Sequence, residues 1–180
     1  MNKLKWVVFG CLMVLTLGIF TGCGAKVTAD QEKTVSLNQA FEMGEMELIF
    51  DEVEILDEVK PNVTIGYYNY YEQHDGYHYI VAQGIVENKS SSVQDISAVQ
   101  AVAYRGSAEY EAKLVYGTPG DADLIKEIPA NMKVRCYLIV LCKSDVSSVE
   151  KVSLYFNRNM AEPKKQGHYE NKVTLRLGNY

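Results

Sequence analysis

The chain has 180 residues, 47% of them hydrophobic, and 18 Lys and Arg against 23 Asp and Glu give it a formal net charge of −5. This length suits one ordinary domain behind a short leader. An acidic protein is a poor partner for nucleic acid, because the phosphates repel it, so we expect no nucleic-acid binding.

Residues 1–22 have the layout of an export signal. Lys3 and Lys5 make the start basic, and residues 6–20 form an uncharged apolar run that is too short to cross a membrane comfortably. Thr21 and Gly22 then precede Cys23, and this stretch resembles a bacterial lipobox. The resemblance implies that residues 1–22 are removed and that Cys23 carries lipid, such as palmitate. We therefore predict an extracellular protein anchored to the cell membrane through Cys23.

The next segment, residues 23–33, is polar and shows no periodicity. We interpret it as the lipidated Cys followed by a flexible tether. A pattern typical of a globular domain begins near Thr34, so residues 34–180 are predicted to form the folded unit.

Short β-rich segments separated by turn residues fill that unit, and no segment keeps a helical period for three turns. A change of phase after Asp51 predicts a bulge. Asp75 and Gly76 predict a hairpin between residues 66–72 and 77–87. The predicted strands are 39–43, 46–59, 66–72, 77–87, 93–105, 109–116, 133–143, 149–156 and 172–177.

The segment 133–143 is apolar on both faces, which is typical of a strand in the middle of a sheet. It contains Cys136 and Cys142, whose Cα atoms would lie roughly 20 Å apart in an extended strand. A disulfide needs Cα atoms within about 7 Å, so these thiols cannot bridge each other. We expect two buried, reduced cysteines.

About eight or nine strands without crossover helices predict an antiparallel β-sandwich. Residues 79–88 (YIVAQGIVEN), the Tyr-rich segment before them, residues 128–133 and residues 169–175 are similar to small immunoglobulin-like lipoproteins of Gram-positive bacteria. This resemblance implies a telokin-like, immunoglobulin-type sandwich and an extracellular accessory or interaction role. It brings no catalytic residues.

Tyrosines gather between residues 67 and 79. Neighbouring Tyr residues in a strand point to opposite faces, so some rings pack the sandwich and others meet solvent or a partner. Packing and recognition both remain open for them. The candidate partner-binding residues are Tyr67, Tyr68, Tyr70, Tyr71 and Tyr77.

The same stretch carries three candidate metal ligands, His74, Asp75 and His78. They would meet if the chain turns at Asp75, and two exposed turn residues are the alternative interpretation. No phosphate loop, zinc-protease motif or nucleophile elbow occurs, so we expect no cofactor and no enzyme activity.

Two functions follow from these observations. The first is a membrane-anchored, non-enzymatic interaction module whose partner is another envelope protein or a cell-wall glycan. The alternative is a small-ligand or metal-binding lipoprotein that uses the hairpin of His74, Asp75 and His78.

Overall fold

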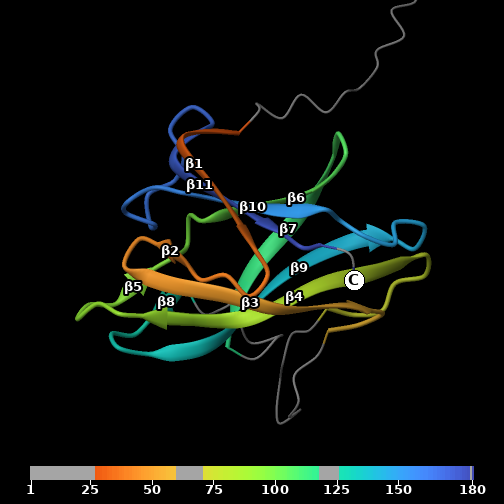
Figure 1. Ribbon diagram of the computed structural model, residues 1–180, viewed down its shortest axis with the longest axis horizontal. Coiled ribbons are helices and arrows are strands. Elements are labelled where there is room, and N and C mark those ends of the chain that lie inside the picture. The colour runs from red at the N-terminus through yellow and green to blue at the C-terminus, as the bar shows by residue number, and fades with distance from the viewer. Residues whose placement is uncertain (1–26, 60–70, 118–125, 179) are drawn as a thin grey trace, which may run out of the picture.

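The computed structural model describes residues 27–59, 71–117, 126–178 and 180, and these form an all-β protein (Figure 1). The strands are β1 (Thr28–Ser36), β2 (Phe41–Met43), β3 (Met46–Leu56), β4 (Tyr77–Asn88), β5 (Gln94–Asp95), β6 (Gln100–Arg105), β7 (Ala108–Tyr116), β8 (Glu127–Ile128), β9 (Lys133–Lys143), β10 (Lys151–Phe156) and β11 (His168–Arg176).

Nine of these strands belong to one hydrogen-bonded sheet, in the order β1-β11-β10-β6-β7-β9-β4-β3-β2. β5 and β8 form a separate small pair. All neighbours in the large sheet are antiparallel except β1 and β11, which are parallel.

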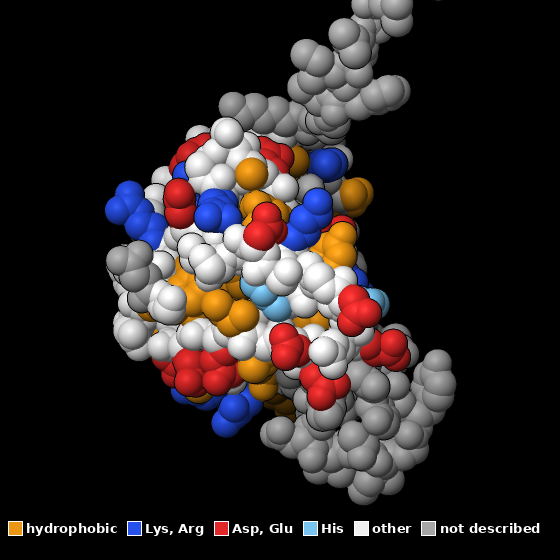
Figure 2. All heavy atoms as spheres, turned by 90° about the vertical axis from the view of Figure 1, so that its right-hand side faces the viewer, with side chains coloured by type: hydrophobic (Ala, Val, Ile, Leu, Met, Phe, Trp, Pro, Cys, Tyr) orange, Lys and Arg blue, Asp and Glu red, His pale blue; other side chains and the backbone are white. Residues whose placement is uncertain are grey.

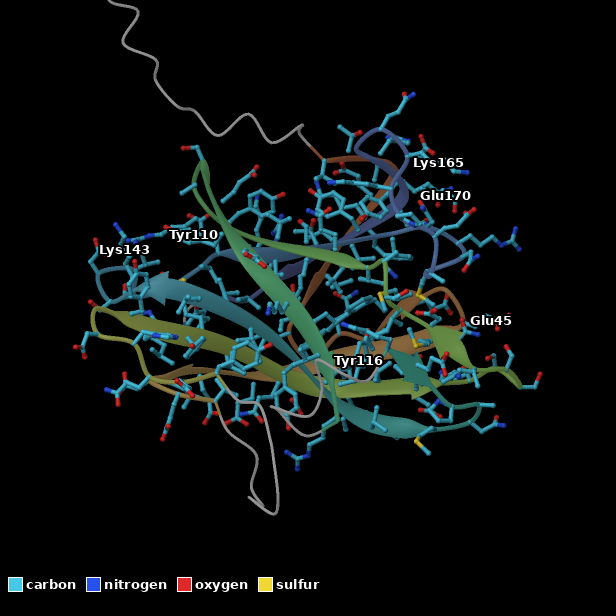
Figure 3. All side chains as sticks on the ribbon, turned by 180° about the vertical axis from the view of Figure 1, so that it is seen from behind. Glu45, Tyr110, Tyr116, Lys143, Lys165 and Glu170 are labelled. Atoms are coloured by element: carbon cyan, nitrogen blue, oxygen red, sulfur yellow. The ribbon has the colours of Figure 1, made fainter. Side chains whose placement is uncertain are left out.

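The large sheet folds over itself at β7. Residues 108–112 of this strand pair with β6, and residues 112–116 pair with β9, so Ala112 has a partner on each side. β7 therefore runs diagonally from one layer to the other (Figure 3). Side chains from both ends of the sheet, such as Val35, Phe41 and Leu175, lie in a single buried core, which makes the molecule a β-sandwich.

The predicted central strand is confirmed, because β9 lies between β7 and β4. Leu138 and Val140 on one face belong to the main core, and Ile139 on the other belongs to a second apolar cluster. Cys136 and Cys142 are buried and reduced, as expected. Burial raises the pKa of both thiols, that of Cys142 to about 11.

The predicted bulge is also confirmed, as a register shift between Phe50 and Glu52 where β3 pairs with β4. Gly84 lies opposite Phe50, and a Cβ at this position would stand 2.2 Å from the carbonyl oxygen of Ile49. The two strand backbones thus approach so closely that only glycine fits at position 84.

The predicted pairing of residues 66–72 with 77–87 is wrong, and residues 66–70 themselves lie outside the described residues. β4 already has β3 on one side and β9 on the other, so both sides of its backbone are paired. Tyr71 instead forms an isolated bridge with Val59. Asp75 and Gly76 do turn the chain, and the Tyr77 amide donates to the His74 carbonyl at 3.0 Å, but the turn leads from a loop into β4.

Two other boundaries need correction. The tether predicted for residues 23–33 is wrong from Thr28 onward, because β1 begins there. β1 has no apolar alternation to signal it, since nearly all its side chains are exposed and its backbone bonds to β11 hold it. The predicted strand 93–105 is split into β5 and β6 by a turn in which the Val99 amide donates to the Ile96 carbonyl at 3.1 Å.

Candidate binding face

A second, smaller apolar cluster lies on the outer face of the layer formed by β3, β4, β9 and β7. The outer face of an antiparallel sheet is commonly exposed to water, so these side chains can be buried only if another segment of the chain lies over them. The chain between β3 and β4 supplies part of this cover, through the bridge between Val59 and Tyr71. The cluster consists of Val59, Tyr79, Val81, Val115, Tyr137 and Ile139, with Leu56 and Tyr71 packed against it.

Tyr79 and Tyr71 are the aromatic centre of this cluster. Their rings meet edge to face with centroids 5.6 Å apart, a favourable geometry for aromatic pairs. The buried Tyr79 hydroxyl donates to the Glu72 carbonyl at 2.8 Å. Burial, and then the nearby Glu72 carboxylate, raise the pKa of Tyr79. The Lys113 ammonium stands 5.5 Å from the centre of the Tyr71 ring.

Two apolar side chains on the same outer face remain exposed beside the bridge between Val59 and Tyr71. Leu141 is the cross-strand partner of Tyr79 and is 44% exposed, and Tyr77, two residues before Tyr79, is 41% exposed. We call Tyr71, Tyr77, Tyr79, Tyr137 and Leu141 the aromatic face.

Acidic side chains surround this end of the sandwich. Glu52 and Glu54 lie on β3 opposite Gln83 and Val81, and therefore on the same outer side. Figure 2 views the end of the molecule where β3 finishes and β4 starts, with apolar side chains at the surface and acidic ones below and beside them. Asp57, Glu72 and Asp75 are exposed in the segments next to these strands.

The predicted partner-binding tyrosines have different outcomes. Tyr71 and Tyr77 lie on the aromatic face, the first half-buried and the second exposed. Tyr67, Tyr68 and Tyr70 lie outside the described residues. Tyr79, Tyr137 and Leu141 were not among the predicted site residues, although the apolar character of both faces of residues 133–143 was a signal that something covers the outer face.

The structure does not bring the three candidate metal ligands together. His74 and Asp75 are exposed on the turn, whereas His78 points to the inner side of β4, where its Nε2 lies 2.8 Å from the Val146 carbonyl oxygen. Among the described residues, no three His, Cys, Asp or Glu side chains are grouped so that they could hold a metal ion.

The predicted lipidation site, Cys23, lies outside the described residues. Within the part of the chain that is described, no helix is long and apolar enough to span a bilayer.

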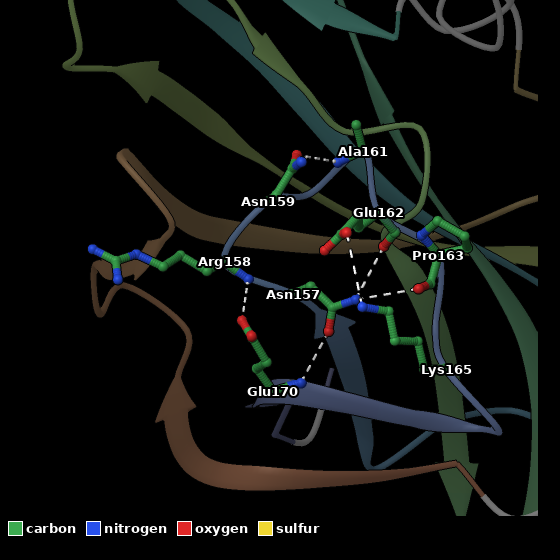
Figure 4. Close-up of polar contacts among 8 residues, drawn as sticks. All are labelled: Asn157, Arg158, Asn159, Ala161, Glu162, Pro163, Lys165 and Glu170. Atoms are coloured by element: carbon green, nitrogen blue, oxygen red, sulfur yellow. Dashed lines mark hydrogen bonds and ion pairs between the residues drawn. The ribbon is translucent and has the colours of Figure 1, made fainter.

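A polar loop between β10 and β11 was not predicted from the sequence (Figure 4). The buried Asn157 organises it, because its Nδ2 donates to the carbonyls of Glu162 and Pro163 while its Oδ1 accepts the Glu170 amide at 3.1 Å. Next to this loop, between β1 and the β2–β3 turn, is an open depression of about 760 Å³. Its wall carries both signs of charge, including Lys33, Glu45 and Arg158.

No family model matches the chain, and no curated protein matches it. Among solved structures, the chain is similar to an uncharacterized β-sandwich protein from Clostridium difficile 630, with a TM-score of 0.54 and 19% identity over 82% of this chain and 95% of that one. For the yjhA protein from Bacillus subtilis the TM-score is 0.45, with 10% identity over 79% of this chain and 98% of that one. The first likeness confirms the β-sandwich fold and shows the fold alone.

Proposed function

We propose that this chain is a membrane-anchored extracellular lipoprotein that serves the cell envelope as a non-enzymatic interaction module. We further propose an immunoglobulin-type sandwich like that of small lipoproteins of Gram-positive bacteria. The observation that carries the proposal is the aromatic face, an apolar outer surface of which only part is covered. Its partner is another envelope protein or a cell-wall glycan.

The composition of the aromatic face supports this role. Tyr77 combines a large apolar ring with a hydroxyl that can bond to a partner, and such side chains are enriched where proteins meet one another. Leu141 stands beside it with 44% of its surface exposed. Both flank the buried Tyr79, so the exposed surface continues into a rigid, packed base.

The position of Cys23 supports the anchor. Thr28, where β1 starts, is only the fifth residue after Cys23. A chain of that length spans at most about 18 Å, so lipid on Cys23 holds the sandwich close to the bilayer. A partner within the envelope is then concentrated on the same surface.

The anchor is tested by metabolic labelling with an alkynyl palmitate analogue. We expect label and membrane association for the full chain, and neither for Cys23→Ser. Label on the Cys23→Ser protein, or a wild-type chain without label, would remove the lipoprotein proposal.

The contact surface is tested by affinity capture from native membranes with the full chain as bait. The test variant combines Tyr77→Ser and Leu141→Ser. The control combines Val93→Ser and Met132→Ser, two apolar residues that are 53% and 42% exposed away from the aromatic face. One protein or wall fragment retained by the wild type and the control, and lost with the test variant, supports the proposal. Equal retention by all three baits contradicts it.

A further inference from the structure

The second half of β3 is an open edge of the large sheet. β2 pairs with β3 only from Met46 to Leu48, while β4 pairs along the whole strand on its other side. The Asn38 amide adds one bond to the Phe50 carbonyl at 2.7 Å. From Asp51 to Leu56, no described residue pairs with the open side of the strand. As far as the described residues go, the backbone groups there are therefore open to another strand.

This edge adjoins the aromatic face. Leu56 packs against the outer apolar cluster and is the cross-strand partner of Tyr79. Ile55, which points to the other side of the sheet, is 45% exposed at the edge. A strand added here would therefore find apolar surface on its inner side and the rim of the aromatic face on its outer side.

The outer side of the edge is acidic. Glu52 and Glu54 point there, and Asp57, Glu72 and Asp75 are exposed nearby. Two described basic residues lie on the outer face at this end of the sheet: Lys113, which stands over the Tyr71 ring, and the exposed Lys143 at the end of β9. The other two, Arg135 and Lys133, pair with Ile85 and Glu87 toward the opposite end of β4. The balance favours a cationic partner, because opposite charges attract across neighbouring strands.

A second copy of the chain fits this edge poorly. If two copies paired antiparallel about Val53, Glu52 of one copy would lie opposite Glu54 of the other. Like charges directly opposite each other destabilise a strand pair. Acidic side chains and a bulge are devices by which sheet edges resist self-association.

We propose that the open edge of β3, from Asp51 to Leu56, binds an extended cationic segment of the partner by strand addition. In that segment Lys or Arg side chains lie on the outer side of the sheet, next to Glu52 and Glu54. The apolar residues that alternate with them lie on the inner side, next to Ile55. Backbone hydrogen bonds supply affinity, and the alternation of side chains supplies specificity. The inference rests on the proposed function and names the chemistry of its partner.

The test is a titration of the full chain, in neutral detergent, with a fluorescently labelled peptide of alternating Lys and Val, followed by anisotropy. The comparison probe alternates Glu and Val. The test variant is E52Q/E54Q, which keeps side-chain size and an oxygen that can accept the bond Glu54 takes from the Gln83 amide. The matched control is E109Q/E111Q, two exposed glutamates at the same spacing on β7.

We expect the Lys-containing peptide to bind the wild type and the E109Q/E111Q control equally, and to bind E52Q/E54Q on the order of tenfold more weakly. Raising the ionic strength from about 0.05 to 0.3 M weakens the wild-type complex, because exposed charges are screened. Equal binding of the Lys and Glu peptides, or equal binding by the two variants, would overturn the inference. Glu52 and Glu54 would then only protect the sheet edge against self-association.

The same variants separate this inference from the proposed function. If native capture is lost with Tyr77→Ser and Leu141→Ser but unchanged with E52Q/E54Q, the aromatic face is the contact and the cationic strand is wrong. If capture is unchanged with both variants, the proposed function fails as well.

Discussion

Asn88 is a residue whose replacement we expect to damage the fold strongly. It ends β4 and is fully buried. Its Nδ2 donates to the carbonyls of Ser92 at 2.8 Å, Ile128 at 2.9 Å and Pro129 at 3.0 Å, and its Oδ1 accepts the Ser90 amide at 3.0 Å. One amide group thus ties the end of β4 to two separate turns.

The cost of Asn88→Ala follows from these contacts. Each ordinary hydrogen bond contributes about 1 kcal/mol, and a buried group left without a partner costs about 1–3 kcal/mol. The side chain of Asn88 makes four such bonds from a buried position. We expect a loss of about 3–4 kcal/mol, a large share of the 5–15 kcal/mol typical of a folded domain. Asn88→Asp should lose more, because a carboxylate would face three carbonyl oxygens.

The assay is equilibrium unfolding in urea. With a slope of about 2 kcal/mol/M, the Asn88→Ala midpoint should fall by roughly 1.5–2 M. The control is Asn159→Ala, an exposed residue whose Oδ1 accepts one bond, from the Ala161 amide at 3.2 Å. It should lose less than about 1 kcal/mol. Equal losses for the two alanine variants would refute the reasoning.

Three other predictions concern the core. Gly84→Ala should unfold the protein at a much lower temperature than wild type in a thermal melt, because its Cβ would stand 2.2 Å from the Ile49 carbonyl oxygen; an unchanged melting temperature would contradict the close approach. Tyr116→Phe should leave stability unchanged or raise it by about 1–2 kcal/mol, because the buried Tyr116 hydroxyl has no hydrogen-bond partner among the described residues; a loss above 1 kcal/mol in urea unfolding would reveal one. Stability should fall as pH rises from about 9 to 11, because the unfolded chain releases the Cys142 proton near pH 9 and the folded chain holds it to about pH 11. Cys142→Ala should flatten that decline by up to about 1.4 kcal/mol per pH unit, and an unchanged slope would contradict the assignment.

Much of the fold could be predicted from the sequence where side chains report on burial. The two apolar faces of residues 133–143 predicted the central position of β9, and the phase change after Asp51 predicted the bulge in β3. Hydrophobic periodicity is strong in these segments because they are buried on one or both sides.

The sequence was less informative where backbone hydrogen bonds alone determine which segments pair as strands. β1 is held along the edge by pairing with β11, and its exposed polar side chains resemble a tether. The hairpin before β4 was predicted from local turn chemistry, but β3 and β9 already occupy both sides of β4. Long-range pairing overrode the local signal.

In the candidate site, too, some features could be predicted from the sequence and others depend on the pairing of distant strands. The abundance of Tyr between residues 67 and 79 left packing and recognition both open. Only the register of β4 against β9 brings Leu141 beside Tyr79. His78 has the same parity along β4 as the buried Ile80, so it points inward and away from His74. A spacing of four residues in the sequence could not reveal that separation.

The measurement that tests the contact surface most directly is photo-crosslinking in living cells. Leu141 of the full chain is replaced by p-benzoylphenylalanine, and Met132, which has a similar exposed fraction at 42%, is replaced in a control. Light should produce one adduct of discrete mass from position 141 and none from position 132. No adduct from position 141, or the same adducts from both positions, would contradict the assignment of the aromatic face as the contact surface.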